Sequence, residues 1–159
     1  MEKLEPILNI QTSLYQPEFA DAFKQLNLDW ISKYFEVEQK DIEQLENPED
    51  CLREGGQIFF ILKDGHPVAT CALYLEKEGV YELAKMAVSD ECKGLGLANK
   101  LMREIEMWVL ANGGHEIFLL SNDSLGAAMG LYSKHGYEVF FRGSHPEYDR
   151  ANIGMRKSL

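Results

Sequence analysis

The stretch of residues 80–108 constrains the fold more than any other, because a strand pattern runs through a turn with two glycines directly into a helix pattern. Residues Val80–Val88 are mostly apolar or β-branched, which is typical of a largely buried strand. After a short polar connection, apolar residues recur at helical spacing at Leu97, Leu101, Ile105 and Trp108. This stretch therefore predicts a strand, a tight turn and an amphipathic helix that packs one face inward.

The two glycines, Gly94 and Gly96, stand immediately before the predicted helix. Without a Cβ atom the backbone turns tightly, so several N–H groups can converge at the partly positive end of the helix and bind an anion. Neither the G-x-G-x-x-G pattern of dinucleotide folds nor the G-x-x-x-x-G-K-[ST] loop is present. On these residues alone, a phosphate site and a simple turn both stay open as interpretations.

The rest of the chain alternates between helix and strand patterns. Helices are predicted over residues 18–34, 40–45, 49–53 and 125–135. Further strands are predicted over residues 4–14, 58–62, 67–77, 116–121, 136–141 and 151–157. The pairs Asp64-Gly65 and Glu78-Gly79 are short hairpin turns, so the three strands that they join are expected to be antiparallel. The continuous apolar strand over residues 116–121 is expected in the centre of the sheet.

The length and the N-terminal sequence bound the class of protein. At 159 residues the chain fits one domain, predicted over residues 1–159, which buries roughly two-thirds of its unfolded surface. The N-terminal residues include acidic side chains and no hydrophobic signal core, and no apolar run approaches the roughly twenty residues of a membrane span. These features predict a cytoplasmic protein that does not bind a membrane.

Cysteine and histidine give no pattern of a structural site. Cys51, Cys71 and Cys92 are an odd number without C-x-x-C spacing, which argues against a disulfide framework and against a zinc site. The four histidines lie in different segments without metal-ligand spacing, so no metal site is predicted. Cys92 precedes the predicted helix and is interpreted either as a reactive thiol or as a packed, inert one.

The net charge is strongly acidic. Lysine and arginine number 16 against 26 aspartates and glutamates, which gives a formal net charge of −10. Such a surface repels nucleic acid, so no nucleic-acid partner is expected, and it favours the approach of a cationic or amine-bearing substrate. An acidic surface also serves solubility, so the charge alone does not identify a ligand.

Two separate motifs are similar to those of one enzyme family. The turn carries Lys93, Gly96 and Ala98 in the pattern Gln/Arg-x-x-Gly-x-Gly/Ala, with lysine in the first position. The segment 121–140 follows T/S-N-x-x-L-x-x-A-x-x-L-Y-x-x-x-G-F/Y, with matches at Asn122, Leu125, Ala128, Leu131, Tyr132, Gly136 and Tyr137. On both motifs the chain resembles the GNAT family of N-acetyltransferases. The resemblance implies an α/β GNAT fold, with a mixed, mainly antiparallel sheet of about seven strands flanked by helices.

The resemblance also implies a binding site for acetyl-CoA. In the family, the strand before the glycine turn and the strand after the long helix splay apart, and the pantetheine arm pairs with the backbone of the first strand. Coenzyme contacts are therefore implied at Met86, Ala87 and Val88. The pyrophosphate is implied to lie on Lys93, Gly94, Leu95, Gly96, Leu97, Ala98 and Asn99. Asn122 is interpreted either as a partner of the pantetheine arm or as a helix cap.

Two residues are candidates for proton transfer. Tyr132 holds the position of the family's tyrosine that protonates the departing thiolate of the coenzyme, and the alternative is a structural tyrosine. Glu82 lies six residues before Val88, where some family members, notably histone acetyltransferases, carry a glutamate that accepts the proton of the amine. A buried carboxylate has a raised pKa, which suits a base. The alternatives are a structural glutamate and proton transfer through water.

Two further regions are candidates for contact with the acceptor. The aromatic residues Tyr34 and Phe35 follow the first helix pattern, and they either line a substrate pocket or pack in the core. Tyr148 and Arg150 belong to a polar loop over residues 144–150 that either borders the acceptor site or is solvated. An arginine there would suit a carboxylate on the acceptor.

Together these observations predict an N-acetyltransferase that moves the acetyl group of acetyl-CoA to a primary amine by direct attack. The acceptor is a small-molecule or peptide amine, and its identity stays open, as does a homodimer. The alternative is a non-catalytic module that binds an acyl-CoA for sensing or regulation, and a purely structural domain is a third class. Tyr132 and the glycine turn favour the enzyme.

Overall fold

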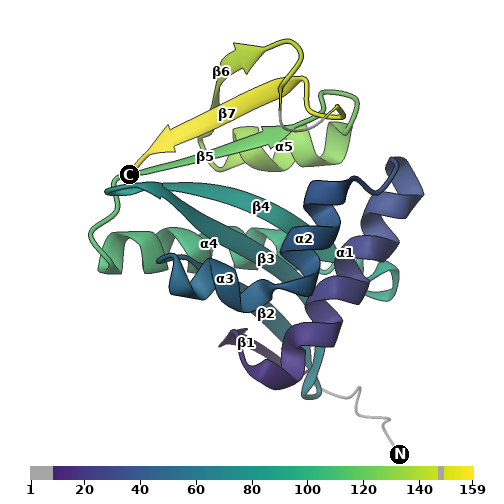
Figure 1. Ribbon diagram of the computed structural model, residues 1–159. Helices are drawn as coiled ribbons and strands as arrows, with labels where there is room; N and C mark the ends of the chain where they lie inside the picture. The colour runs from purple at the N-terminus through teal and green to yellow at the C-terminus, as the bar shows by residue number, and fades with distance from the viewer. Residues whose placement is uncertain (1–8, 147–148) are drawn as a thin grey trace, which may run out of the picture.

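The structure, a computed structural model that describes residues 9–146 and 149–159, is an α/β fold with a seven-stranded mixed sheet flanked by helices (Figure 1). The strands are β1 (Ile10–Leu14), β2 (Gln57–Lys63), β3 (His66–Lys77), β4 (Val80–Val88), β5 (Glu116–Ser121), β6 (Glu138–Arg142) and β7 (Ile153–Ser158). The helices are α1 (Ala20–Tyr34), α2 (Gln39–Glu46), α3 (Pro48–Arg53), α4 (Leu97–Ala111) and α5 (Gly126–Lys134), with 3-10 turns η1 (Pro17–Phe19) and η2 (Asp90–Cys92). The predicted fold class is confirmed.

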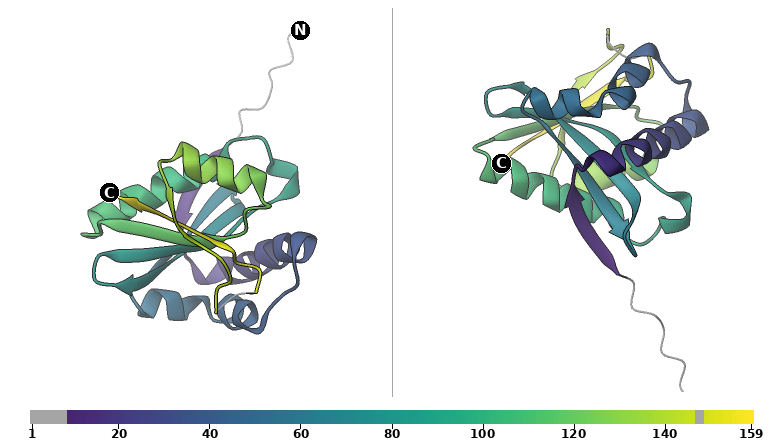
Figure 2. Two further views of the ribbon diagram at one scale, coloured as in Figure 1. Left: turned by 90° about the horizontal axis from the view of Figure 1, so that it is seen from above. Right: turned by 60° about the horizontal axis from the view of Figure 1, so that its bottom comes forward.

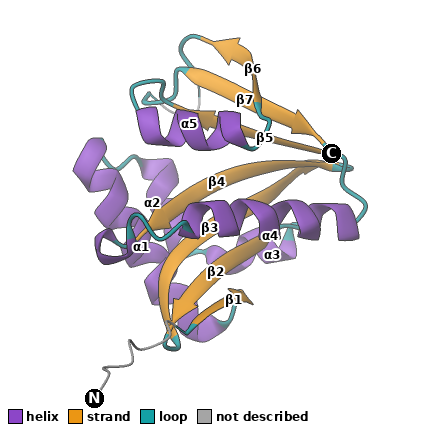
Figure 3. Cartoon of the chain, turned by 180° about the vertical axis from the view of Figure 1, so that it is seen from behind, coloured by secondary structure: helices purple, strands orange, loops and turns teal. Residues whose placement is uncertain are grey.

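The sheet separates two layers of helices. Helices α4 and α5 cover one face, and α1, α2 and α3 cover the other (Figures 2 and 3). The core beneath α4 and α5 includes Leu73, Leu101, Met102, Ile105, Ile117 and Leu119. The core beneath α1 to α3 includes Phe23, Ile31, Leu45, Ile58 and Phe60. Each such side chain contributes about 1.5–3 kcal/mol by leaving water, which fixes both layers on the sheet.

The strand order is β1-β2-β3-β4-β5-β7-β6. Strands β2, β3 and β4 form the predicted antiparallel meander. Its first turn has Asp64 at φ 51° and Gly65 at φ 82°, the two positive angles that a type I′ hairpin requires. Strand β5 lies inside the sheet between β4, which is parallel to it, and β7, which is antiparallel. The prediction of an interior β5 is confirmed.

Strands β4 and β5 separate halfway along β4. Only residues Val80 to Leu83 of β4 pair with β5, and the register of the last pair is Leu83 with Leu119. Beyond that point β5 continues to pair with β7 as far as Ser121, while β4 continues to pair with β3 as far as Val88. The second half of β4 therefore turns one edge toward an opening in the sheet, as the resemblance implied.

A β-bulge interrupts β4 at the same place. Ala84 pairs with Ala72 and Ala87 pairs with Thr70, so two residues, Lys85 and Met86, stand opposite one residue of β3. Lys85 has a left-handed backbone angle, φ 55°. The bulge breaks the alternation of the strand, so that Lys85 contacts α2 while Met86 packs against the core beneath α4.

Several predicted boundaries differ from the structure. Helix α4 begins at Leu97, because Gly94 and Gly96 have φ angles of 83° and 73°, which a helix excludes. The predicted first strand began at residue 4, and its residues 4–8 lie outside the described residues, where β1 starts at Ile10. Over the described residues, no helix has the length and apolar character to cross a membrane.

Candidate active site

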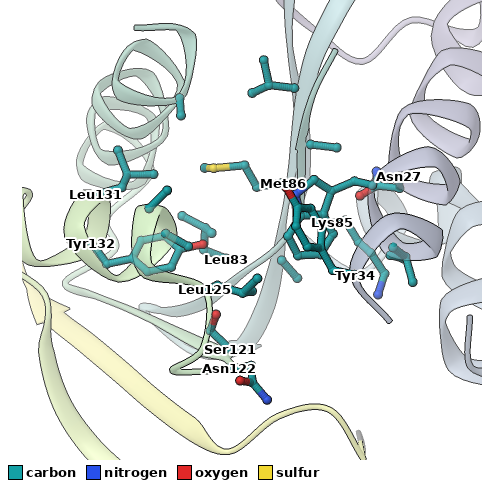
Figure 4. A pocket seen from close by; sticks show the side chains of 18 of the residues that line it. Asn27, Tyr34, Leu83, Lys85, Met86, Ser121, Asn122, Leu125, Leu131 and Tyr132 are labelled. Carbon is teal, nitrogen blue, oxygen red and sulfur yellow. The ribbon is translucent and has the colours of Figure 1, made fainter. Parts of the chain in front are cut away.

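A cavity of about 910 Å³ opens where β4 and β5 separate (Figure 4). One end, called here the turn end, is formed by residues 93–99 and by α5. The other end, called here the α1 end, is formed by Trp30, Tyr34, Phe35, Glu82, Lys85 and Arg150. The second half of β4 runs between the two ends, and it contributes the predicted coenzyme contacts Met86, Ala87 and Val88 to the wall.

The glycine turn is open toward the cavity. A Cβ atom added at Gly94 or at Gly96 would have no heavy atom within 4 Å, so no side chain plugs the turn. The first N–H groups of α4 have no acceptor within their own helix, and the helix dipole makes this end partly positive. The turn therefore has the geometry of an anion site. Of the predicted residues 93–99, all line the cavity except Leu95, whose side chain is exposed.

Lys93 lies at the rim of the turn in a set of exposed charges. Its Nζ is 2.9 Å from Oδ1 of Asp90, which also accepts a hydrogen bond of 3.2 Å from Lys33. Hydrogen bonding to Asp90 raises the pKa of Lys93 above its usual value. The ammonium group also lies 5.9 Å from the ring centre of Tyr34. A permanent cation thus stands beside the turn.

Asn99 is fixed by α5. Its Oδ1 lies 2.8 Å from Nε2 of His135, at the end of α5. Burial lowers the pKa of His135 below its usual value, so the ring is neutral at pH 7 and donates from Nε2 to Asn99. This contact ties the first turn of α4 to α5 across the turn end of the cavity.

Tyr132 projects its hydroxyl into the cavity from α5 (Figure 4). The side chain is buried, with 8% of the residue exposed. Burial, with a smaller effect of Cys71, raises the pKa of Tyr132 above its usual value, so the phenol keeps its proton at neutral pH. The neighbouring Tyr137 packs 6.2 Å away between ring centres but does not line the cavity.

Glu82 lines the cavity at the last paired part of β4. It stands opposite Phe118 of β5, one residue before the strands separate. Its charge acts on Lys85, three residues further along the strand. The predicted base candidate therefore lies at the α1 end, on the strand whose second half borders the cavity.

The side chain of Asn122 makes two hydrogen bonds within the protein. Its Nδ2 donates to the carbonyl of Arg150 at 2.7 Å, and its Oδ1 accepts from the N–H of Ser124 at 2.9 Å. Helix α5 begins after Leu125 and has no side-chain cap, so the helix-cap interpretation of Asn122 is wrong. The residue lines the cavity and joins the end of β5 to the segment before β7.

A buried ionic network at the α1 end was missed by the sequence analysis. Asp41 of α2 has a fully buried side chain. Its Oδ1 accepts from Lys85 Nζ at 2.6 Å and from an Arg150 guanidinium nitrogen at 2.6 Å. Its Oδ2 accepts from a second Arg150 nitrogen at 2.7 Å and from the N–H of Glu38 at 2.9 Å. Arg150 also donates to Glu38 Oε2 at 3.0 Å.

The network shifts the ionisation of its central groups. Burial raises the pKa of Asp41, but the hydrogen bonds from Arg150 and then Lys85 outweigh it and hold the pKa well below its usual value. Burial lowers the pKa of Lys85 although Asp41 opposes this. The one sequence signal was the spacing of Glu38 and Asp41, which form a capping box at the start of α2.

The structure also decides between interpretations of the acceptor region. Arg150 lies partly buried in the network and lines the cavity, so the solvated interpretation of its loop is wrong at this residue, while Tyr148 lies outside the described residues. Tyr34 and Phe35 both line the cavity, and Phe35 also packs against the core beneath α1. Cys92 is buried in the other core and is a packed thiol.

Metal ligands do not gather in the described part of the chain. No group of three or more histidine, cysteine, aspartate or glutamate side chains is arranged there to hold a metal ion. The groups at the cavity are instead an open helix start, a protonated phenol, a carboxylate and paired cations.

A family model, the acetyltransferase (GNAT) family, matches residues 19–137 of the chain. A search of curated proteins finds no significant match. Among solved structures, a GNAT acetyltransferase from Staphylococcus aureus superposes with a TM-score of 0.85 at 23% sequence identity, covering 94% of this chain and 99% of that one.

Two further structures share the fold at lower identity. An acetyltransferase from Streptococcus agalactiae gives a TM-score of 0.80 at 17% identity, covering 94% of this chain and 98% of that chain. A Salmonella typhimurium protein, solved with its cofactor acetyl-CoA, gives 0.76 at 13% identity and covers 94% of both chains.

Proposed function

Because the chain belongs to the acetyltransferase (GNAT) family, we propose that it transfers the acetyl group of acetyl-CoA to a primary amine by direct attack. Acetyltransferases of this family use acetyl-CoA, and a structural neighbour was solved with it. The observation that carries the proposal is that the open glycine turn and the hydroxyl of Tyr132 line one cavity between the separated strands. The rest of the proposal assigns roles to residues around that cavity.

The turn end fits the coenzyme. The open space at Gly94 and Gly96 leaves room for a diphosphate against the N–H groups of the α4 start, and Lys93 adds a cation. The free edge of Met86, Ala87 and Val88 has the backbone groups to pair with an amide-containing arm. Leu95 contributes its backbone only, since its side chain is exposed.

The reaction takes protons from the nitrogen and adds one to the sulfur. The amine nitrogen forms a bond to the acetyl carbon, the carbon–sulfur bond breaks, and the sulfur leaves with the electron pair. Acetyl-CoA supplies the activated acyl group and the leaving thiol. Tyr132 keeps its phenol protonated and donates that proton to the sulfur. Glu82, directly or through water, takes the proton that the ammonium must lose before its nitrogen can attack. The nitrogen loses a second proton as the amide forms, and this proton restores the phenol of Tyr132 through water.

The test uses two buried tyrosines of the same region. Tyr132→Phe is expected to lower kcat for coenzyme release about 100-fold or more, with acetyl-CoA affinity nearly unchanged. Tyr137→Phe is the matched control, because its ring lies beside Tyr132 but outside the cavity wall. It is expected to keep full turnover. An equal loss in both variants contradicts the role of Tyr132.

The same assay tests the alternative of a non-catalytic module. Coenzyme release is measured over a panel of primary amines, and acetyl-CoA binding is measured by calorimetry on the same sample. Tight binding with no release for any amine overturns the transferase and supports a sensing or regulatory module. No binding and no acetyl-CoA-dependent rise in Tm contradicts both.

A further inference from the structure

The charges at the α1 end bear on which amines fit there. We propose that the acceptor is a primary amine with no carboxylate next to the amine, so that free α-amino acids are excluded. The inference rests on the proposed acetyl transfer and names its acceptor class. It is carried by the partners, burial and number of the charged groups around Arg150 and Lys85.

Both cations at this end are already bound by carboxylates of the protein. Lys85 Nζ donates to Asp41 at 2.6 Å, and only 4% of its side chain is exposed. Arg150 donates twice to Asp41 and once to Glu38, at 2.6 to 3.0 Å. A bidentate arginine of this kind is the usual partner of a ligand carboxylate, and here Asp41 holds that place.

Asp41 cannot yield these cations to a ligand at low cost. Its two oxygens accept four hydrogen bonds, which fills the acceptor capacity of a carboxylate. Its side chain has no exposure to water. An acceptor that drew Arg150 or Lys85 away would leave a buried charge with fewer partners, which is strongly unfavourable. The network is thus a fixed wall of the cavity.

The remaining balance of charge favours a cation. Among the described residues of this network, two cations, Lys85 and Arg150, stand against three carboxylates, Asp41, Glu38 and Glu82. The excess within the network is negative. The two lysines that face Tyr34 of the same end, Lys33 and Lys93, are bound by a carboxylate of their own, Asp90. An ammonium group is attracted to such a site, whereas a carboxylate beside the amine meets like charge in a partly dehydrated space.

The α1 end is also lined by aromatic side chains, which guide the choice of probe. Trp30 packs against Tyr34 with 5.2 Å between ring centres and against Phe35 with 6.2 Å. All three line the cavity. Aromatic faces favour both apolar groups and cations, so amines with a phenyl group suit the test.

The experiment compares three compounds with the same skeleton. Phenethylamine, phenylalaninamide and phenylalanine differ only in the group next to the amine, which is hydrogen, a neutral amide or a carboxylate. We expect kcat/KM for coenzyme release to be at least about tenfold higher for the amine and the amide than for the acid. The amide has the bulk of the acid without its charge, so it separates charge from size.

A variant tests whether the protein's charge causes the discrimination. Glu38→Gln removes one carboxylate beside Arg150 and keeps the shape of the residue, and the N–H that Glu38 donates to Asp41 is unaffected. The ratio of kcat/KM for phenylalaninamide to kcat/KM for phenylalanine is expected to fall several-fold. Glu43→Gln is the matched control, because Glu43 lies exposed on α2 away from the cavity wall. It is expected to leave the ratio unchanged.

The outcomes separate this inference from the proposed function. Equal or higher kcat/KM for phenylalanine overturns the inference and leaves acetyl transfer standing. An amide as poor as the acid shows exclusion by size and also overturns it, as does an unchanged ratio in Glu38→Gln. If acetyl-CoA binds but no amine of any kind gives coenzyme release, the proposed acetyl transfer is overturned and the inference with it.

Discussion

Two carboxylates of the protein each hold two cationic side chains, one beside each end of the cavity. Asp41 binds Lys85 and Arg150 beside the α1 end, and its side chain is fully buried. Asp90 binds two lysines beside the turn end, and 71% of its side chain is exposed. Each group thus has one carboxylate between two cations, although Asp41 also accepts a second hydrogen bond from Arg150 and one from the N–H of Glu38. Their largest difference is access to water.

That difference decides what each group does. A buried carboxylate with buried partners is held in one arrangement, because each charge would be costly without the others. An exposed carboxylate between two flexible lysines contributes little to the stability of the fold, and a competing anion can replace it as the partner of the lysines. The α1 end is therefore a fixed wall that selects the acceptor, and the turn end is an adaptable rim that can accept the phosphates of a coenzyme.

The largest difference between the two groups is expected when each carboxylate is neutralised. Asp41→Asn leaves Lys85 and Arg150 without their central anion and is expected to lower the free energy of unfolding by about 3–5 kcal/mol. Asp90→Asn is expected to leave it unchanged, since its partners stay hydrated. Urea unfolding at pH 7 measures both. A loss of stability for Asp90→Asn equal to that for Asp41→Asn contradicts the assignment.

The stability that Asp41 contributes is expected to depend on pH. The pKa of Asp41 is held below its usual value in the folded protein, so the unfolded chain binds more protons as the pH falls below about 4. The contribution of Asp41 to the free energy of unfolding is complete above its pKa in the unfolded chain. It is lost as the pH falls toward its pKa in the folded protein. The gap in unfolding free energy between wild type and Asp41→Asn is therefore expected to narrow by up to about 1.4 kcal/mol per pH unit in this range.

The measurement is urea unfolding of both proteins at intervals from pH 6 to pH 3. The wild type is expected to show the steeper fall, and the two curves are expected to approach each other at the acid end. Parallel curves across the whole range would show that Asp41 has an ordinary pKa in the folded state, and the network would then not be ionic.

The openness of the turn end is tested with two glycines in the same conformation. Gly94 has φ 83° and Gly65 has φ 82°, and a Cβ at either would have no atom within 4 Å. Alanine at either position is expected to cost about 1–2 kcal/mol of stability for the left-handed backbone. Only Gly94 lines the cavity, so Gly94→Ala alone is expected to weaken acetyl-CoA binding, by about tenfold.

Calorimetric titration of acetyl-CoA into both variants measures this difference. Gly65→Ala controls for the strain, because Gly65 is not among the residues that line the cavity. Unchanged affinity in Gly94→Ala would place the diphosphate elsewhere and would reduce the glycines to ordinary turn residues.

The sequence predicted the parts of the molecule whose signal is local. The Asp64-Gly65 hairpin, the amphipathic α4 and the glycine turn each depend on neighbouring residues, and all three are found as expected. Tyr132 could be placed in the site because its motif has fixed spacing along one helix. The fold class was implied by the resemblance of two local motifs to the GNAT family, and the order of helix and strand patterns along the chain agrees with it.

The ionic network could not be predicted, because its members are brought together from distant segments. Asp41 looks like an ordinary acid on a charged helix, and Arg150 looks like part of a polar loop. Lys85 lies in a strand whose alternation places it in the other core, and only the bulge with φ 55° turns it toward α2. A bulge in a strand without glycine leaves no mark in the sequence pattern.

The smallest predicted effect is on acetyl-CoA affinity, and it concerns the exposed group of Asp90, Lys93 and Lys33 at the turn end. Asp90→Asn removes the anion that holds Lys93 and Lys33, so both lysines can turn to the phosphates of acetyl-CoA. Binding is expected to tighten about two- to fivefold at low salt, and the gain is expected to vanish at about 1 M salt, where charges are screened beyond about 3 Å. Glu91→Gln changes the net charge equally without touching these lysines and serves as the control. If Asp90→Asn weakens binding, Asp90 instead orients Lys93 for the coenzyme, and the exposed carboxylate is as much a fixed part of its site as the buried one.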